Sequence, residues 1–245
     1  MATDLLDRVR KLLAQAEDEG TTAAEAEAFT ARASELMARY GIDRALLGAT
    51  RPETDKPGDK TFPLDNPWAA IKGHMIARLG GALRCQVVLV KKDDDGSRSA
   101  RVFGYQSDIE RTEVLYTSLQ VQMVRALAVQ PAPAGGYTGI KAWRRSWMLG
   151  YITAVVARVR AAEESAEQSA TSAGETAGSG GKSTALVLAD RSLTVRRRVQ
   201  AAYPHLRRTK VTYTGNGYAA GHREGQKADI GGAKLRSRPA GAIGR

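Results

Sequence analysis

The chain has one cysteine, few aromatic residues and no long apolar run, and each shortage excludes a class of protein. A single cysteine, Cys85, excludes an internal disulfide framework and a zinc site built from clustered cysteines. No stretch of about 18 apolar residues occurs, so the sequence predicts no membrane span. The first seven residues lack the basic start and apolar stretch of a signal peptide. Together these absences predict a cytoplasmic protein.

The composition is that of a globular protein, but its charge is uneven. Hydrophobic residues make up 42% and charged residues 26% of the 245 positions, which favours one or two folded domains. The net charge is +11, yet residues 1–50 carry −3 and residues 201–245 carry +7. A basic end of this kind favours a polyanionic partner, of which nucleic acid is the commonest. The alternative is that the basic end reflects only solubility or a GC-rich genome.

The first fifty residues are predicted to form a helical hairpin. Apolar residues recur every three or four positions between Leu5 and Ala16, which is the spacing of one helix face. Thr22 and Glu25 have the spacing of a capping box for a second helix. Gly41 stands where a helix commonly ends.

The same hairpin resembles a known family. The stretches that carry the resemblance are Val9–Ala16, Glu25–Ala28 and Glu35–Ile42. They are similar to the bacterial and phage family called domain of unknown function 2786, over about residues 5–45. Phe103-Gly104 with Asp108, and later Trp147 with Gly150, resemble the companion region that often follows that domain. The resemblance implies an architecture and a bacterial or phage setting, and it implies no reaction.

The rest of the chain is predicted to be α+β and mainly helical. A helix is expected to begin at Asn66-Pro67-Trp68, followed by strands near 85–90 and 100–103 joined by an Asp-Gly turn at 93–96. A capping box at Ser107 and Glu110 predicts a long helix, and another helix is expected from about Lys141. The C-terminal portion is predicted as a basic α/β segment, with strands at 184–189 and 209–214 around a helix at 193–203.

These elements predict a division into six segments. They are a helical hairpin domain (1–48), a linker (49–66), a central α+β core (67–164), a flexible linker (165–183), a C-terminal strand and helix segment (184–231) and a basic tail (232–245).

A basic and aromatic cluster at 141–147 is the most informative candidate site. Arginine and lysine can bind phosphates while tryptophan stacks on bases, although Trp143 and Trp147 are also spaced as a core stripe. Further basic groups follow toward the C-terminus. The predicted nucleic-acid-binding residues are Lys141, Arg144, Arg145, Arg196, Arg197, Arg198, Arg207, Arg208, Lys210, His222, Arg223, Lys234, Arg236 and Arg238.

The function that these features favour is a non-enzymatic, nucleic-acid-binding accessory protein, with DNA or RNA as the partner. No catalytic residue, metal ligand or cofactor is predicted. One alternative is a hydrolase whose site forms only in the fold, from His74 or His222 with Asp108. The other is a protein-interaction module that docks a protein partner through residues 1–48.

Two further motifs are interpreted as structural. Gly178–Thr184 resembles a phosphate-binding loop, but Thr176 stands where that loop needs its first glycine. Cys85 begins an apolar stretch, which favours a buried thiol over a reactive one.

Overall fold

The computed structural model describes residues 8–9, 11–12, 14–15, 23–91, 97–131, 137–178, 181–206 and 215–228. Within them the short stretches before residue 16 are helical. The elements that follow are α2 (Ala23–Thr50), the 3-10 helix η1 (Pro52–Thr54), β1 (Pro57–Pro63), α3 (Ala69–Ala82), β2 (Gln86–Lys91), β3 (Arg98–Tyr105), α4 (Gln106–Ala128), α5 (Tyr137–Ser172), α6 (Thr184–Ala202) and α7 (Tyr218–Lys227). The predicted α+β, mainly helical class is confirmed.

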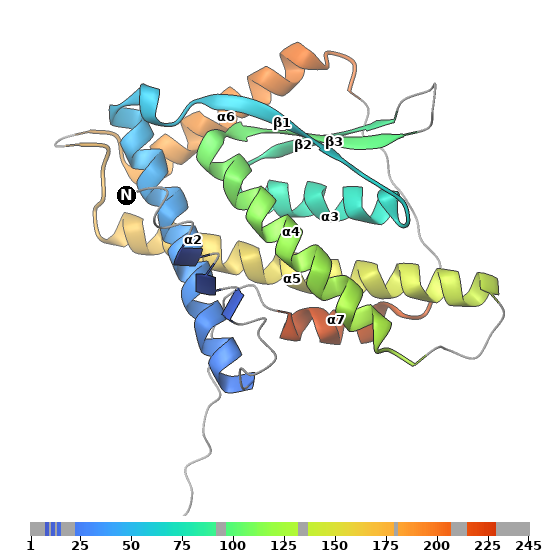
Figure 1. Cartoon of the computed structure of the whole chain (residues 1–245). Helices are drawn as coiled ribbons and strands as arrows, with labels where there is room; N and C mark the ends of the chain where they lie inside the picture. Colours follow the sequence, from blue (N-terminus) through green and yellow to red (C-terminus); the bar gives the residue numbers. More distant parts are fainter. Residues whose placement is uncertain are drawn as a thin grey trace, which may run out of the picture.

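The three strands form one antiparallel sheet in the order β1-β3-β2. The β2–β3 pair confirms the predicted hairpin, whose turn lies outside the described residues. In Figure 1 helix α3 lies against one face of this sheet and α6 against the other, with α5 beyond α3 and α7 on the far side of α5. The molecule is therefore layered, with the sheet between helices.

The alternation of side chains along β3 explains why both faces of the sheet are covered. Ala100 and Val102 belong to the main hydrophobic core with α3 and α5. Phe103 points to the opposite face and packs with Val195 and Val199 of α6. A strand that places apolar side chains on both faces needs a helix on each.

Helix α7 packs on α5 through glycines. A Cβ atom on Gly221 would lie 2.6 Å from the carbonyl carbon of Trp147, and one on Gly225 would lie 2.9 Å from Cα of Tyr151. Only a residue without a side chain allows the two backbones to approach this closely. Glycine at both positions is therefore required for α7 to lie this close to α5.

Residues 49–66 were predicted as a linker because of their prolines and charges, and this prediction is wrong for residues 57–63. These residues form β1 at the edge of the sheet, where Phe62 is buried and pairs with Ala100 of β3. Pro57 and Pro63 stand at the ends of the strand. Proline and charge are common on edge strands because one side of the backbone makes no ladder bonds.

Two predictions in the C-terminal half are also wrong. Residues 184–189, predicted as a strand, begin the helix α6, because a short apolar run fits either structure and the helical spacing continues through Val195 and Val199. The predicted flexible segment 165–183 is helical as far as Ser172. Alanine and glutamate favour a helix even where the surface is polar.

Two predicted helix boundaries differ from the structure. Helix α2 does not end at Gly41 but continues to Thr50, and the guanidinium of Arg111 lies beside Gly41 within it. Ser107 and Glu110 do not form a capping box. Ser107 bonds instead to Asp55, a tertiary contact, and Glu110 accepts a bond from Gln106 of the same helix.

Candidate nucleic-acid interface

A basic cavity lies between α3, the free end of the β2–β3 hairpin and the first turns of α5. Its volume is about 830 Å³, within the range of about 300–1,000 Å³ that is typical of ligand pockets. Four cationic side chains line it: Lys91 ends β2, Arg98 begins β3, and Lys141 and Arg145 come from α5. No aspartate or glutamate is among its described lining residues. The described lining of the cavity therefore carries a net positive charge.

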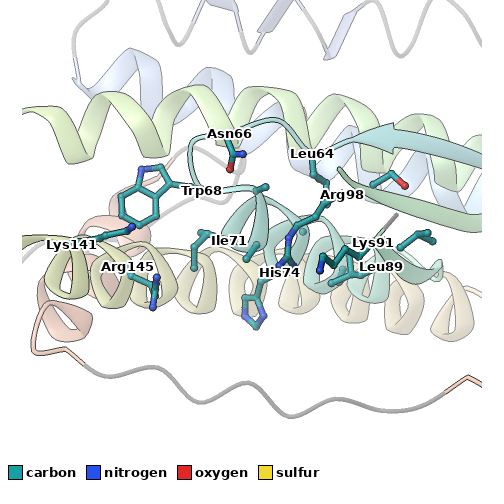
Figure 2. Close-up of a pocket in the computed structure, with 16 residues that line it drawn as sticks. Leu64, Asn66, Trp68, Ile71, His74, Leu89, Lys91, Arg98, Lys141 and Arg145 are labelled. Atoms are coloured by element: carbon teal, nitrogen blue, oxygen red, sulfur yellow. The ribbon is translucent and has the colours of Figure 1, made fainter. Parts of the chain in front are cut away.

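The cations reach the cavity as two pairs of like charge. Lys91 and Arg98 stand directly opposite each other in the antiparallel ladder. Lys141 and Arg145 are four residues apart on one helix, so they share a face. Like charges in either arrangement repel and destabilise the fold slightly. Figure 2 shows the two pairs at opposite ends of the cavity, with Ile71 and His74 of α3 between them.

The floor of the cavity is apolar. Leu64, Ile71 and Leu89 line it together with small residues of α3. Gly73 contributes to its depth, because a Cβ atom there would lie 3.0 Å from a methyl group of Leu64 and 3.2 Å from one of Leu89. The cavity thus combines an apolar base with a charged rim, which suits an amphipathic anion better than a bare ion.

Trp68 stands at the end of the cavity near Lys141 and Arg145 (Figure 2). It is half-buried, and it also lines a second cavity of about 660 Å³ with Asn66, Lys141 and Arg144. Its backbone has φ 71° and ψ 24°, the left-handed region. For a residue with a bulky side chain this conformation costs on the order of 1 kcal/mol. Its carbonyl accepts bonds from the amides of Ile71 and Lys72, which fixes the start of α3.

His74 lies on α3 in the middle of the cavity and is half-buried. Burial lowers the pKa of this imidazole below 6.5, and the positive charge of Arg78 lowers it further. His74 is therefore neutral at pH 7, and an anion in the cavity would favour its charged form.

The structure brings only part of the predicted site together. Lys141, Arg144 and Arg145 line the two cavities. Arg196, Arg197 and Arg198 are exposed on α6, across the sheet from α3. His222 and Arg223 lie on α7, on the other side of α5 (Figure 1), where His222 stacks on Tyr218. The remaining predicted residues, Arg207, Arg208, Lys210, Lys234, Arg236 and Arg238, lie outside the described residues.

Sequence reasoning missed Trp68, Lys91 and Arg98 as site residues, and it considered His74 only for the hydrolase alternative. A usable signal existed for Lys91 and Arg98, because basic residues flank the hairpin turn on both strands and must stand near each other. No local signal places α5 beside them. Trp143, considered as a base-stacking residue, packs against the main core and lines neither cavity, whereas Trp68 packs against the same core and lines both. Trp147 is fully buried.

The buried charges of the protein form a separate cluster that is electrically balanced. Arg191 of α6 lies 2.8 Å from Asp55 and 3.0 Å from Asp108. Arg111 bridges Asp108 at 3.1 Å and Glu163 of α5. A third arginine, Arg84, lies 2.5 Å from Glu163. The cluster thus holds three arginines and three carboxylates. We call these six side chains the buried ion network.

The buried ion network bears on the hydrolase alternative. Asp108, the carboxylate considered for catalysis, is held by Arg111 and Arg191, and Arg191 also stacks on the ring of Tyr105 at 3.6 Å. His74 lines the basic cavity instead. Across the part of the chain that the structure describes, no group of three or more His, Cys, Asp and Glu side chains is placed to hold a metal ion.

Cys85 is buried beside Thr112, 3.6 Å from its hydroxyl. Burial, with a smaller contribution from the charge of Asp108, raises the pKa of this thiol to about 12. The thiolate is the reactive form of cysteine, so Cys85 is inert at neutral pH. The interpretation of a structural thiol is confirmed.

Comparison with known proteins adds one finding for the N-terminal part of the chain. No curated protein and no solved structure matches the sequence. None of the described helices has both the length and the apolar content to cross a membrane. Residues 4–44 match the model of the family described as "Protein of unknown function (DUF2786)", so the N-terminal segment carries the domain that its sequence resembles.

Proposed function

We propose that this protein is a non-enzymatic, nucleic-acid-binding accessory protein of bacterial or phage origin that acts in the cytoplasm. The observation that carries the proposal is the meeting of two like-charge pairs, Lys91 with Arg98 and Lys141 with Arg145, at one cavity whose described lining residues include no carboxylate. Phosphates placed between these cations would contact both pairs and release counterions. Arg144 extends the same charge to the second cavity.

The proposal moves the main binding surface away from the C-terminal residues. Arg196, Arg197 and Arg198 lie across the sheet from the cavity, so they do not contact the phosphates that it holds. The basic residues after position 206 remain predicted contributors. These residues would contact further phosphates and so increase the length of nucleic acid that is bound, but they would not determine which nucleotide lies in the cavity.

We expect the double variant Lys141→Ala/Arg145→Ala to bind nucleic acid more weakly and with less dependence on salt. Each lost phosphate contact lowers the slope of log affinity against log salt by about 0.7 for single strands and about 0.9 for duplex DNA. Fluorescence anisotropy of labelled DNA and RNA, titrated at several salt concentrations, measures both quantities.

A matched control removes the same charge elsewhere. Arg196→Ala/Arg197→Ala takes two exposed cations from α6, across the sheet from the cavity. If this control weakens binding as much as the cavity variant, the assignment to the cavity is wrong. If the unmodified protein binds no nucleic acid even at low salt, the proposed function is wrong.

Affinity should also rise as the pH falls below 6.5. His74 is neutral in the free protein because burial and Arg78 lower its pKa. A phosphate in the cavity favours the imidazolium and raises that pKa, so binding takes up a proton. The charged groups around His74 are Arg78 on its own helix and Lys91, Arg98, Lys141 and Arg145 in the described lining of the cavity.

His74→Gln should flatten this pH profile and leave the salt dependence unchanged. The same residue affects stability in the opposite sense. A lowered pKa means that the folded protein binds fewer protons than the unfolded chain, so the free protein loses stability as the pH falls through 6.5. Anisotropy measures the pH dependence of binding, and thermal melting measures that of stability, for the unmodified protein and for His74→Gln around pH 6.5. If the variant shows the same pH dependence as the unmodified protein in both measurements, the role of His74 is contradicted.

A further inference from the structure

The apolar floor of the basic cavity is not explained by phosphate binding alone. Phosphates need cations on a surface, and the rim already supplies them through Lys91, Arg98, Lys141 and Arg145. The floor formed by Leu64, Ile71 and Leu89 adds a depth that a phosphate leaves empty. A duplex keeps its bases stacked and paired inside, and thus presents only its backbone and groove edges. The cavity therefore suits a nucleic acid with an unpaired base.

Trp68 supplies the second observation. It packs in part against the core, has a left-handed backbone and lines both cavities. Indole rings bind unpaired bases by stacking, and every base offers a face for this contact. A strained position that holds an aromatic ring beside cations is therefore an arrangement suited to bind a base and its phosphates together.

The positions of the cations fit a strand that crosses the cavity. Lys91 and Arg98 stand at one end, and Lys141 and Arg145 stand at the other beside Trp68 (Figure 2). A strand that runs from one pair to the other passes the apolar lining residues between them.

We propose that the ligand class is single-stranded nucleic acid, and that one unpaired base enters the basic cavity and stacks on Trp68 while its flanking phosphates bind the two cation pairs. This inference rests on the proposed function and narrows it. The cations should bind the phosphates of single strands and duplexes alike, whereas Trp68 should contribute only where a base is unpaired.

The test compares a labelled single strand, the duplex of the same sequence and a single strand of abasic sites, all at matched salt. The unmodified protein should bind the normal single strand most tightly. Trp68→Ala should weaken that binding roughly 5- to 150-fold, the range expected for one base-stacking contact. It should leave the duplex, the abasic strand and the salt slope nearly unchanged, because no phosphate contact is lost.

Trp68→Phe guards against a folding defect. Phenylalanine retains an aromatic face, so most of the affinity should return. The unmodified protein should show quenching of its tryptophan fluorescence when the strand binds, whereas Trp68→Phe should bind with that quenching largely removed. The remaining indoles do not replace it, since Trp147 is fully buried and Trp143 lines neither cavity.

The outcomes separate this inference from the proposed function. Equal affinity for single strand and duplex, with Trp68→Ala affecting both alike, overturns the inference and leaves nucleic-acid binding standing. If a nucleoside monophosphate displaces the labelled single strand completely at equal phosphate concentration, the ligand is a free nucleotide and the proposed single-stranded ligand is overturned. The absence of salt-dependent binding to all three probes overturns both proposals.

Discussion

Arg111→Ala is expected to lower the free energy of unfolding by about 3–5 kcal/mol. The guanidinium of Arg111 is fully buried and lies between Asp108 and Glu163. Burial alone would lower the pKa of Arg111, but the two carboxylates outweigh it and hold that pKa above its ordinary value, so the side chain stays charged. Its removal leaves buried carboxylate charge without full compensation. Urea denaturation followed by circular dichroism measures the loss.

A surface ion pair provides the matched control. Lys60 and Glu113 form an ion pair of 2.7 Å, with 48% and 40% of their side chains exposed. Lys60→Ala should change the free energy of unfolding by about 1 kcal/mol or less, because water screens and replaces such contacts. If Arg111→Ala does not yield folded protein, Arg111→Lys keeps the charge without the forked donors and should show a smaller loss. Equal effects at positions 60 and 111 would show that the buried ion network contributes no special stability.

Gly41→Ala is expected to destabilise the protein, and to do so only while Arg111 is present. A Cβ atom at position 41 would lie 2.5 Å from the guanidinium carbon of Arg111. Asp108 and Glu163 hold that guanidinium in place, so it cannot move aside without loss of its ion pairs. Overpacking of this kind costs about 1–3 kcal/mol. Alanine in an otherwise open helix position would instead stabilise by about 1 kcal/mol relative to glycine.

The sign of the Gly41→Ala effect should therefore reverse in the Arg111→Ala background. The space left by the guanidinium accepts the new methyl group, and α2 gains the helix preference of alanine. Gly81 of α3 offers an independent reference, because a Cβ atom there would meet no atom within 4 Å. Gly81→Ala should be stabilising in both backgrounds. Additive effects of the changes at 41 and 111 would contradict the contact between them.

Periodic apolar residues made the long helices predictable. The stripe of α4, from Ile109 through Leu115 to Leu119, is buried as its spacing indicates. The buried ion network was not predictable in the same way, because each charged residue needs a partner from another element. A partial signal was present, since Arg111 and Arg191 stand on helix faces whose other members are apolar or buried. A charge on a buried stripe indicates a distant partner but does not identify it.

The candidate site was predictable only at its α5 edge. Lys141, Arg144 and Arg145 are adjacent in sequence, so their cluster was visible. The cavity itself depends on the packing of α3 and the β2–β3 hairpin against α5, and these contacts join residues about 40 to 75 positions apart. Short apolar runs were ambiguous for a related reason. The run at 184–189 fits a strand or a helix until its burial against Ile42 and Ala170 is known.

The course of helix α2 limits where this chain can be divided. The family match ends at residue 44, whereas the helix runs without interruption to Thr50 and has Gly41 against Arg111. The matched segment thus ends inside a helix, so a fragment or graft that keeps α2 whole should be cut after residue 50.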